Sequence, residues 1–456
     1  AAIGAPAQTS AKWLYESVGD GATRRAGDHD RLTRHMNSGL AREQLHRTDL
    51  ARQVIRARQD QWRFTRGQLV IIDEASLADT RTLARLTLQA REAGAKVLLV
   101  GDHMQRGAVD AGGAFRMLAR RGPVAELTTL WRFTHPWEAR ASLQLRRGHT
   151  QALDAYAAHG ALTAGDLDTM LDAALDAAAA AQSGGRVAIL QAVDTRTVRE
   201  LNARVRADRI LTGHVTRDRG VTLHDGLTAS AGDRIVTRRN NRHLTIGDGR
   251  AGYVRNGALW DVIAVHRDGA LLVTPARRDH AHTAATTDGA GVAGGAATTD
   301  VVRLPAAYVA EHVELGYATT TARSQGITVD ESHTITTPGM GREDLYVAMT
   351  RGRHHNHAYI AVPDDGDHCH PQTGRGRAPS TAQRAITPEA RDVLEQILTT
   401  SHAERSATET WHEFHPDQPP PLPPLRPPGD QGFLRTPPGL GSRPLPPPPE
   451  RLGIGR

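Results

Sequence analysis

The stretch Leu69-Val70-Ile71-Ile72-Asp73-Glu74-Ala75-Ser76 decides the fold class of this chain. Its four leading apolar residues predict a short buried strand that ends at Asp73. Residues 80–93 follow with apolar side chains on one helical face, and residues 96–100 predict a second strand, ending at Gly101-Asp102. A strand, a helix and a strand in this order indicate an α/β fold with a parallel sheet. Both strands then carry acidic residues to the edge where such sheets bind ligands.

The same alternation returns in the second half of the chain. It predicts a strand over 186–190, a helix over 198–210 and a last strand over 357–362, with an alanine-rich helix over 167–182. The region from 226 to 309 differs, because short strand-like segments follow one another there, at 233–237, 260–265 and 269–273. We interpret this region as a small β-barrel inserted into the second α/β unit.

Length and composition limit the class of protein. The chain has 456 residues, enough for two or three packed units and a tail. Lysine and arginine number 56 against 50 acidic residues, which suits a polyanionic partner but also describes an ordinary solvated surface. The single cysteine, Cys369, excludes an intramolecular disulfide framework and predicts a cytoplasmic protein. The sequence holds no run of about 20 apolar residues and no signal peptide at residues 1–6, so we expect no membrane insertion.

Low-complexity sequence marks the C-terminal end. Proline dominates from about Trp411, with runs at 419–424 and 446–449, so we expect an extended or disordered tail. Such a tail is a linker, the interpretation that we favour, or a ligand for a proline-recognising partner. Residues 280–300, rich in Ala, Gly and Thr, predict a flexible loop inside a domain.

The first candidate site is the acidic pair Asp73-Glu74. In a nucleoside triphosphatase, an aspartate at a strand end holds the water shell of Mg²⁺ and a neighbouring glutamate orients the attacking water. An ordinary polar strand end would carry the same two residues. Gln105, after Gly101-Asp102, favours the triphosphatase because a further polar element then follows the next strand. The 456 residues nevertheless contain no G-x-x-x-x-G-K-[ST] phosphate loop, since neither lysine, Lys12 or Lys96, follows a glycine.

Several stretches resemble motifs of superfamily 1 helicases. Residues 73–76 resemble motif II, 130–138 (Leu-Trp-Arg-Phe-Thr-His-Pro-Trp-Glu) motif IV, 316–330 motif V and 345–353 (Leu-Tyr-Val-Ala-Met-Thr-Arg-Gly-Arg) motif VI. The resemblance implies two RecA-like P-loop NTPase lobes that bind ATP and Mg²⁺ between them. Because the phosphate loop is absent, half of that pocket is expected from a preceding segment.

The resemblance also gives each matching residue a role. Asp73 would bind Mg²⁺ through water, Glu74 would orient the attacking water, and Gln105 of motif III and Gln325 of motif V would serve the nucleotide. Arg132 of motif IV would reach the γ-phosphate, and Arg351 of motif VI would be the arginine finger that stabilises charge in phosphoryl transfer. Taken singly, each arginine would be a surface salt bridge in so arginine-rich a chain.

Candidate DNA contacts follow from the same motifs. Residues 5–10 resemble motif Ia, where Thr9 or Ser10 would donate to a DNA phosphate, whereas Ser10 as the N-cap of an ordinary helix is the alternative. In motif V, Thr320 and Arg323 are the DNA candidates, although Ala322 replaces a histidine and Arg323 a lysine that many relatives carry. For Trp131 and Trp137, stacking on bases competes with packing in the core, which we favour.

Within superfamily 1, the chain most resembles the RecD-like branch and the helicase portion of MobF-type (TrwC/TraI-like) conjugative relaxases. Residues 234–240, 253–260 and 304–309 resemble the SH3-like barrel of that family and its return into the motor. The resemblance implies a 5′-to-3′ ATP-driven helicase that acts on single-stranded and plasmid DNA. The strand-transferase part of such relaxases has no counterpart here, and His354, His355 and His357 are expected to be surface or strand-end residues rather than its metal cluster.

The resemblance implies a domain order. Residues 1–130 form the first lobe, N-terminally truncated; 131–225 begin the second lobe; 226–310 form the SH3-like barrel; 311–362 complete the second lobe; and 363–456 form a tail, mostly disordered from about 411. The tail is a candidate contact for other conjugation proteins. Without the phosphate loop, we expect the chain as given to be inactive. A RecD-like exonuclease subunit, a stand-alone helicase and a non-catalytic DNA-binding remnant are the alternatives.

Overall fold

The computed structural model describes residues 7–38, 41–108, 112–127, 129–247, 252–276, 300–362, 386–403, 405–415 and 418. The chain divides into two compact units. Unit 1 comprises residues 1–101, 110–114 and 405–456, and unit 2 comprises residues 102–109 and 115–404. Each unit is described by itself.

Unit 1 contains the predicted strand, helix and strand. The strands β1 (Leu69–Ile72) and β2 (Lys96–Leu99) pair in parallel, and α4 (Thr80–Ala93) buries the apolar face formed by Leu83, Leu86 and Ala90. Asp79 caps the start of α4 by accepting from the Thr82 N–H, and Gly94 ends it at a φ of 70°, a conformation that favours glycine. The prediction of an α/β fold with a parallel sheet is therefore confirmed for this segment.

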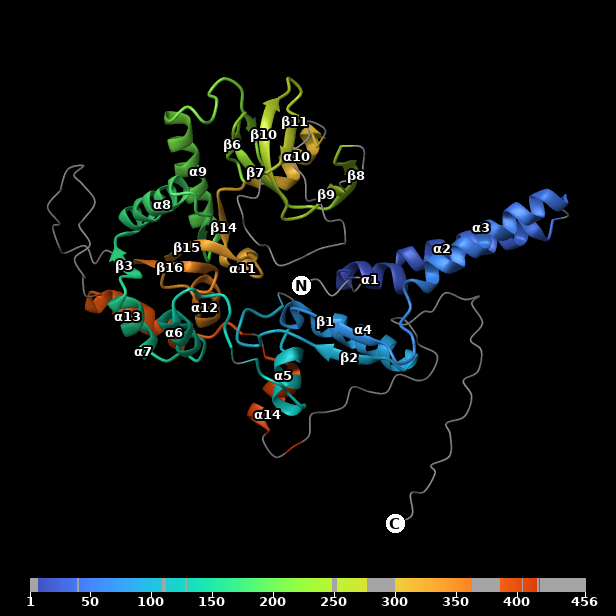
Figure 1. Cartoon of the computed structure of the whole chain (residues 1–456), viewed down its shortest axis with the longest axis horizontal. Coiled ribbons are helices and arrows are strands. Elements are labelled where there is room, and N and C mark those ends of the chain that lie inside the picture. Colours follow the sequence, from blue (N-terminus) through green and yellow to red (C-terminus); the bar gives the residue numbers. More distant parts are fainter. Residues whose placement is uncertain are drawn as a thin grey trace, which may run out of the picture. The chain divides into compact units, whose positions relative to one another are not determined.

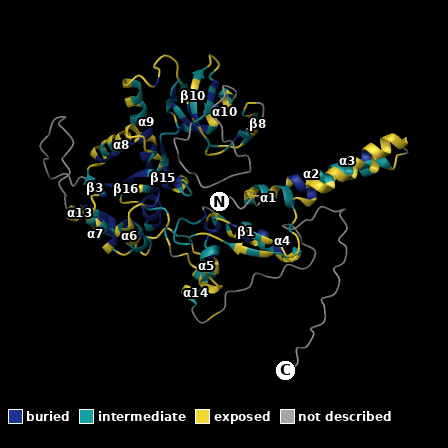
Figure 2. Cartoon of the chain, in the orientation of Figure 1, coloured by how far each residue is buried: buried dark blue, intermediate teal, exposed yellow. Residues whose placement is uncertain are grey.

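Three helices precede β1, of which the sequence offered only the first, as the alternative in which Ser10 caps an ordinary helix. They are α1 (Ser10–Ser17), α2 (Asp20–Met36) and α3 (Arg42–Asp60). The helices α2 and α3 run side by side as a hairpin (Figure 1), and most of their surface is exposed (Figure 2). Polar pairs rather than an apolar stripe join them, as where Arg25 donates to Gln59 at 2.8 Å and Arg56 to His29 at 3.1 Å. The helical period of apolar residues is therefore weak, and sequence reasoning missed these helices.

Unit 2 is built on a five-stranded parallel sheet. Its strand order is β14 (Ala318–Thr320), β4 (Ala188–Ala192), β15 (Val329–Thr336), β16 (Gly352–Ala361) and β3 (Leu162–Gly165). Besides α10 (Ala306–His312), the helices of this unit are α5 (Ala114–Arg121, whose first residue belongs to unit 1), α6 (Pro136–Arg146), α7 (Gln151–Ala158), α8 (Leu167–Ser183), α9 (Thr195–Leu211), α11 (Thr321–Ser324), α12 (Arg342–Ala348) and α13 (Pro388–Thr399). Parallel sheets are covered by helices on both faces, and this sheet follows that rule.

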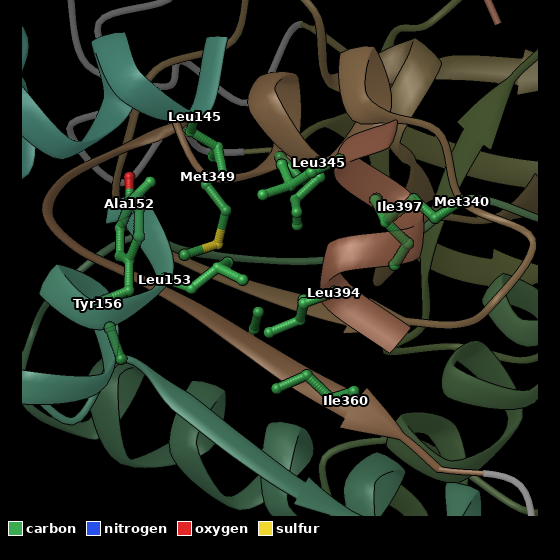
Figure 3. Packing of buried hydrophobic residues seen from close by; sticks show 14 of the residues in the cluster. Leu145, Ala152, Leu153, Tyr156, Met340, Leu345, Met349, Ile360, Leu394 and Ile397 are labelled. Carbon is green, nitrogen blue, oxygen red and sulfur yellow. The ribbon is translucent and has the colours of Figure 1, made fainter. Parts of the chain in front are cut away.

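Two hydrophobic clusters hold the helices to the sheet. In the first, α6, α7, α12 and α13 pack with β16; Leu145, Leu153, Leu345, Ile360 and Leu394 lie close together there (Figure 3). In the second, α8 and α9 pack on β4, β14 and β15. The helix α13 falls in the range that the sequence assigned to the tail, yet its Leu394 and Ile397 are fully buried in the first cluster.

The strand β16 is longer than predicted and begins at Gly352 rather than His357. His354 and His355, expected before the strand, are part of it, and His357 is buried rather than a surface residue. The prediction failed because these histidines interrupt the apolar run that marks a buried strand.

A second, antiparallel sheet lies between β4 and β14 in the sequence. Its order is β12 (Val302–Leu304), β11 (Leu271–Pro275), β10 (Leu259–Val265), β7 (Arg234–Thr237) and β13 (Val313–Leu315). Two short hairpins, β5 (Val221–Thr222) with β6 (Thr228–Ala229) and β8 (Asn241–Thr245) with β9 (Tyr253–Val254), and the helix α10 (Ala306–His312) complete the region. Its core includes the fully buried Trp260, whose Nε1 donates to Thr237 Oγ1 at 3.2 Å.

Asp233 ties this antiparallel sheet to α9. Its carboxylate accepts from Arg206 Nε at 2.9 Å, from the Ser230 N–H at 2.7 Å and from the Tyr317 hydroxyl at 2.7 Å. Burial, followed by the charge of Asp233, raises the pKa of Tyr317, so this phenol stays a hydrogen-bond donor. A fully buried carboxylate with three donors is satisfied and fixes the inserted sheet on the parallel one.

The remaining sequence predictions fall largely outside the described residues. The flexible loop predicted over 280–300 and the proline-rich tail lie there almost entirely, as does Cys369, while α14 (Ala407–Phe414) is a described helix of unit 1. No helix in the described ranges combines the length and the apolar character that a membrane span requires.

Candidate functional site

The acidic pair lies at the carboxyl end of β1 in unit 1. Asp73 is exposed and accepts the Glu74 N–H through Oδ1 at 2.9 Å. Glu74 has a φ of 49° and is the one non-glycine residue in the left-handed region among the described residues. Left-handed backbone at a glutamate is costly, and such strain gathers at functional sites. The Ala75 N–H donates to the Val100 carbonyl at 2.9 Å, which secures the turn after β1 against the end of β2.

Thr9, not Ser10, caps the first helix. The Thr9 hydroxyl accepts the Lys12 N–H at 3.2 Å, and Ser10 is the first residue of α1. The helix of the capping alternative is therefore present, but its N-cap is Thr9 rather than Ser10.

Residues 102–106, which carry Gln105, are held within unit 2. Asp102 accepts from Arg146 Nη2 at 2.8 Å and from the Tyr346 hydroxyl at 3.1 Å, and Arg106 donates to the buried Asp344 at 2.7 Å. The Gln105 N–H donates to the Asp102 carbonyl at 3.2 Å. Sequence reasoning missed Arg146 and Asp344, because their partners lie far away along the chain.

Arg351 lies at the end of the turn after α12 and is 1 % exposed. Its Nε donates to the Val347 carbonyl at 2.8 Å, and its Nη1 donates to the carbonyls of Ser324 and Ile327, each at 3.3 Å. The guanidinium therefore joins the 324–327 segment to the turn that follows α12.

The 320–325 segment, the predicted motif V, surrounds a buried polar network. Gln191 donates to Ser332 Oγ at 2.6 Å and to the Ala348 carbonyl at 3.1 Å, and it accepts from Ser324 Oγ at 2.8 Å. This network links β4, β15, α11 and α12, and no sequence signal pointed to Gln191.

The three predicted motif V residues have different surroundings. Both side-chain polar atoms of Gln325 are buried and have no hydrogen-bond partner among the described residues, an arrangement that calls for an explanation. Thr320 is buried. Arg323 is exposed in part and pairs with Glu314 at 3.1 Å, so its charge is matched.

Residues 132–138 form a segment, called the strap below, that runs along the residues around Arg351. Arg132 donates to the Thr350 carbonyl, the Thr134 N–H donates to the Arg353 carbonyl at 2.8 Å, and Thr134 Oγ1 lies 3.0 Å from His354 Nδ1. The predicted motifs IV and VI are therefore adjacent in unit 2.

The strap ends at Glu138, a carboxyl that is 1 % exposed. Its Oε1 accepts from Asn356 Nδ2 at 2.7 Å, whereas its Oε2 has no partner among the described residues. Burial raises the pKa of Glu138 to about 7, against the pull of the Asn356 hydrogen bond. A carboxyl that titrates near neutral pH is a candidate functional group, and sequence reasoning missed it.

The two tryptophans of the 130–138 stretch differ. Trp137 stacks on His159 with ring centroids 3.8 Å apart and packs against the first hydrophobic cluster, which confirms the prediction of core packing. Trp131 is 90 % exposed, so that prediction is wrong for this residue.

A layer of histidines lies on the face of unit 2 that α8 covers. Glu331 pairs in register with His355 and His333 with His357, and His355 Nε2 lies 3.2 Å from His357 Nδ1. Burial lowers the pKa of His355 and that of His357, the latter to about 3, so both rings are neutral at pH 7. Within the described residues no group of three or more His, Cys, Asp or Glu side chains is arranged to hold a metal ion.

A basic patch lies on the hairpin of β8 and β9. Arg242 and Arg255 flank the Tyr253 ring, with guanidinium carbons 5.7 and 5.4 Å from its centroid. Arg242 and the neighbouring His243 are exposed, and no described acidic side chain pairs with Arg242. Cations beside an aromatic ring suit the phosphates and bases of a single strand.

Comparison with known proteins gives two findings at the level of sequence. Residues 1–167 match the family model described as an AAA domain. A probable conjugal transfer protein TraA of Sinorhizobium fredii is 29 % identical over an aligned length of 310 residues, and the alignment covers 64 % of this chain and 25 % of that protein. The conjugal transfer protein TraA of Rhizobium radiobacter is 31 % identical over 291 residues, 62 % of this chain and 24 % of that protein. The chain thus spans about a quarter of the length of these relatives.

Solved structures give a weaker likeness. A Bacteroides Pif1 bound to single-stranded DNA has a TM-score of 0.40 at 17 % identity, over 66 % of this chain and 73 % of that one. The Pif1 helicase of Candida albicans has a TM-score of 0.39 at 17 % identity, over 72 % and 78 %. These TM-scores are too low to support an argument about function.

Proposed function

We propose that this chain is the helicase portion of a conjugative DNA-transfer protein of the MobF, RecD-like type, which couples ATP hydrolysis to movement along single-stranded DNA. The observation that carries the proposal is the acidic pair Asp73-Glu74 at the end of a parallel strand, within a segment that matches an AAA domain model, in a chain similar to conjugal transfer proteins. The antiparallel sheet would then be the SH3-like barrel, the domain order would be the one inferred from the sequence, and the location would be the cytoplasm.

Asp73 and Glu74 fit the acidic half of a Mg²⁺–ATP site. Mg²⁺ takes one or two carboxylates and fills its other positions with water and phosphate oxygens, so no cage of three protein ligands is required. Asp73 Oδ1 accepts the Glu74 N–H, so Oδ2 would be the oxygen that binds the hydrated metal. The left-handed backbone of Glu74 holds this residue next to Asp73. In such a site the metal neutralises charge on the phosphates, and the glutamate orients a water for attack.

The arginines and glutamines of unit 2 would bind the phosphates of the nucleotide. Arg351 and Arg132 carry fixed planar cations, and both are anchored by backbone carbonyls, which limits the motion of their guanidinium groups. Gln325, whose amide is buried without a partner among the described residues, would gain hydrogen bonds from a nucleotide. Gln105 would also bind this nucleotide.

The phosphate-cradling half of the site is not among the 456 residues, because they contain no glycine-rich loop with a lysine. That loop supplies the backbone amides and the cation for the β- and γ-phosphates. We therefore do not expect ATP turnover from the 456 residues by themselves.

The DNA side of the proposal rests on the basic patch of Arg242, Tyr253 and Arg255, with Thr9, Ser10, Thr320 and Arg323 as further contacts. Arg242 is the strongest of these, since it is exposed and lacks a described acidic partner. Each phosphate neutralised on a single strand contributes about −0.7 to the slope of log affinity against log salt. Plasmid DNA and other conjugation proteins are the wider partners proposed.

The test uses Arg242→Ala and a labelled single-stranded oligonucleotide at several salt concentrations. We expect weaker binding and a salt slope shallower by about 0.7, the value of one lost phosphate contact. Arg303→Ala is the matched control, because Arg303 lies on β12 of the neighbouring antiparallel sheet but pairs with Asp268. Equal effects of the two variants would contradict a DNA contact at the hairpin.

A non-catalytic DNA-binding protein is the second candidate. The absent phosphate loop favours it, as does Arg351, whose bonds to three carbonyls already give it a structural role. Both candidates predict DNA binding. They differ in the ATP turnover expected of a protein that joins this chain to a phosphate loop, where only the helicase would lose DNA-stimulated hydrolysis on Glu74→Gln substitution.

A further inference from the structure

At the start of β16 the pairing with β15 shifts register, so that residues 352–355 bulge into a tight turn, which one side chain closes. Asn356 is fully buried; its Oδ1 accepts the Gly352 N–H at 2.7 Å, and its Nδ2 donates to the Gly352 carbonyl at 3.0 Å. A Cβ at position 352 would meet the His355 carbonyl oxygen at 2.1 Å, so only glycine allows this close return. Both polar groups of Gly352 thus depend on the orientation of the Asn356 amide.

Glu138 determines that orientation. Its Oε1 accepts the second hydrogen of Asn356 Nδ2 at 2.7 Å. If the amide were flipped, its oxygen would face the Glu138 oxygen and its NH₂ would face the Gly352 N–H, which loses three hydrogen bonds in a buried place. An acceptor at position 138 therefore selects the one arrangement that closes the turn.

The backbone at Arg351 is fixed from both sides of this turn. The Arg351 carbonyl accepts the Val329 N–H at 3.0 Å, and the Arg353 carbonyl accepts the Thr134 N–H at 2.8 Å, four residues before Glu138 on the same strap. We infer that Glu138 is a positioning residue: through Asn356 it holds the Gly352–His355 turn closed and so fixes the backbone from which Arg351 extends. We call the contacts of Glu138, Asn356 and Gly352 the clamp. Any effect of the clamp on nucleotide chemistry rests on the proposed function, whereas the clamp itself does not.

Hydrogen–deuterium exchange of the 456-residue chain tests the clamp without nucleotide or DNA. Glu138→Leu should speed exchange in peptides covering 350–356 by roughly tenfold, the effect of losing one hydrogen bond that closes a turn. Glu138→Gln keeps an acceptor in place and should stay within about twofold of the wild type. Ser142→Ala is the matched control, since Ser142 is equally buried on α6 but donates only to the Ala139 carbonyl.

A double variant separates positioning from general loosening. If Glu138 acts through Asn356, then Glu138→Leu should add no more than about twofold to exchange in an Asn356→Leu background. Multiplied effects, an unchanged rate in Glu138→Leu, or an equal effect of Ser142→Ala would overturn the inference. Where Glu138→Leu does not fold, Glu138→Asp withdraws the carboxyl by one methylene and carries the same expectations. Failure of the proposed ATP or DNA activity would leave these results unaffected.

Discussion

Arg351 is part of the packing of unit 2, whatever its role toward a nucleotide. A guanidinium that is 1 % exposed and donates to three carbonyls cannot be removed without losing these buried hydrogen bonds. Arg353, two residues further, contributes its backbone carbonyl, which accepts the Thr134 N–H. The motif identified Arg351 in the sequence, but its buried surroundings became visible only in the fold.

The first prediction compares these two arginines. Arg351→Ala should lower the free energy of unfolding of the 456-residue chain by about 2–4 kcal/mol, because several charge-assisted hydrogen bonds are lost and a cavity is left. Arg353→Ala should change it by less than about 0.5 kcal/mol. Urea denaturation monitored by circular dichroism checks both values, and similar losses for the two variants would show that the carbonyl bonds do not stabilise unit 2.

The second prediction concerns the buried carboxyl of Glu138. Its folded pKa of about 7 lies above the ordinary value of 4.5, so the native state retains its proton while the unfolded chain has lost it. The stability from the protonated form is complete below pH 4.5 and is lost as the pH rises through 7. Glu138→Gln removes this dependence, so its stability relative to the wild type should improve by on the order of 2 kcal/mol between pH 5 and pH 8. A difference that stays constant with pH would contradict the burial of an ionisable group.

Glu138 illustrates what sequence reasoning misses at this scale. Asn356 lies 218 residues away along the chain. Neither residue carries a pattern of its own, and their meeting depends on the packing of α6 against β16. Asp73 and Glu74, in contrast, were found because an apolar run places them at a strand end.

Among the elements, β15 and β16 carry an unusual polar layer. His333, His355, His357 and Glu331 lie on the face of these strands that α8 covers. His333, whose Nε2 lies 3.6 Å from the Glu331 carboxylate, and then the hydrogen bond from Arg186 hold the pKa of Glu331 at about 2. His357 Nε2 lies 2.8 Å from Thr163 Oγ1 on β3, so the layer reaches the edge of the sheet.

The third prediction is acid sensitivity of this sheet. The folded pKa of His357, about 3, lies below the ordinary 6.5, so the unfolded chain takes up a proton first as the pH falls. Stability is therefore retained above pH 6.5 and lost below it, by about 2 kcal/mol at pH 5 for His357. His357→Gln should remove that part of the loss. Thermal denaturation between pH 5 and pH 8 measures it, and an unchanged pH profile in the variant would disprove the assignment to His357.

Helices and strands were predicted from the sequence where their pattern of apolar residues is strong, and they were missed where it is weak. The strands β1 and β2 and the helices α4, α8 and α9 have clear apolar periods and were found within a few residues of their ends. The hairpin of α2 and α3 was missed because its contacts are polar, and β16 was found too short because histidines occupy its first half. Helix α13 was missed because it follows a segment that the sequence assigned to the tail.

For the whole molecule, the chain holds the acidic, arginine and DNA-binding candidates of a helicase but no phosphate loop. The fourth prediction is that the purified 456-residue chain hydrolyses ATP no faster than a blank, with or without single-stranded DNA, because the amides and the lysine that hold the β- and γ-phosphates are absent. Steady DNA-stimulated turnover that Glu74→Gln abolishes would contradict this expectation.

The net charge of +6 bears on the partner rather than on the fold. Many arginines are matched by acids, as Arg204 is by Glu200, Asp168 and Asp172, so a DNA-binding surface depends on those without such partners. With about three or four phosphate contacts, binding to a single strand should be micromolar or weaker and depend steeply on salt.

Fluorescence anisotropy of a labelled single-stranded oligonucleotide, titrated with the folded chain at several salt concentrations, tests the proposed function most directly. The account predicts saturable binding at low salt, a slope of about −2 to −3 in log affinity against log salt, and roughly tenfold weaker binding at physiological salt. A flat baseline at low salt from protein with a cooperative melting transition would contradict it.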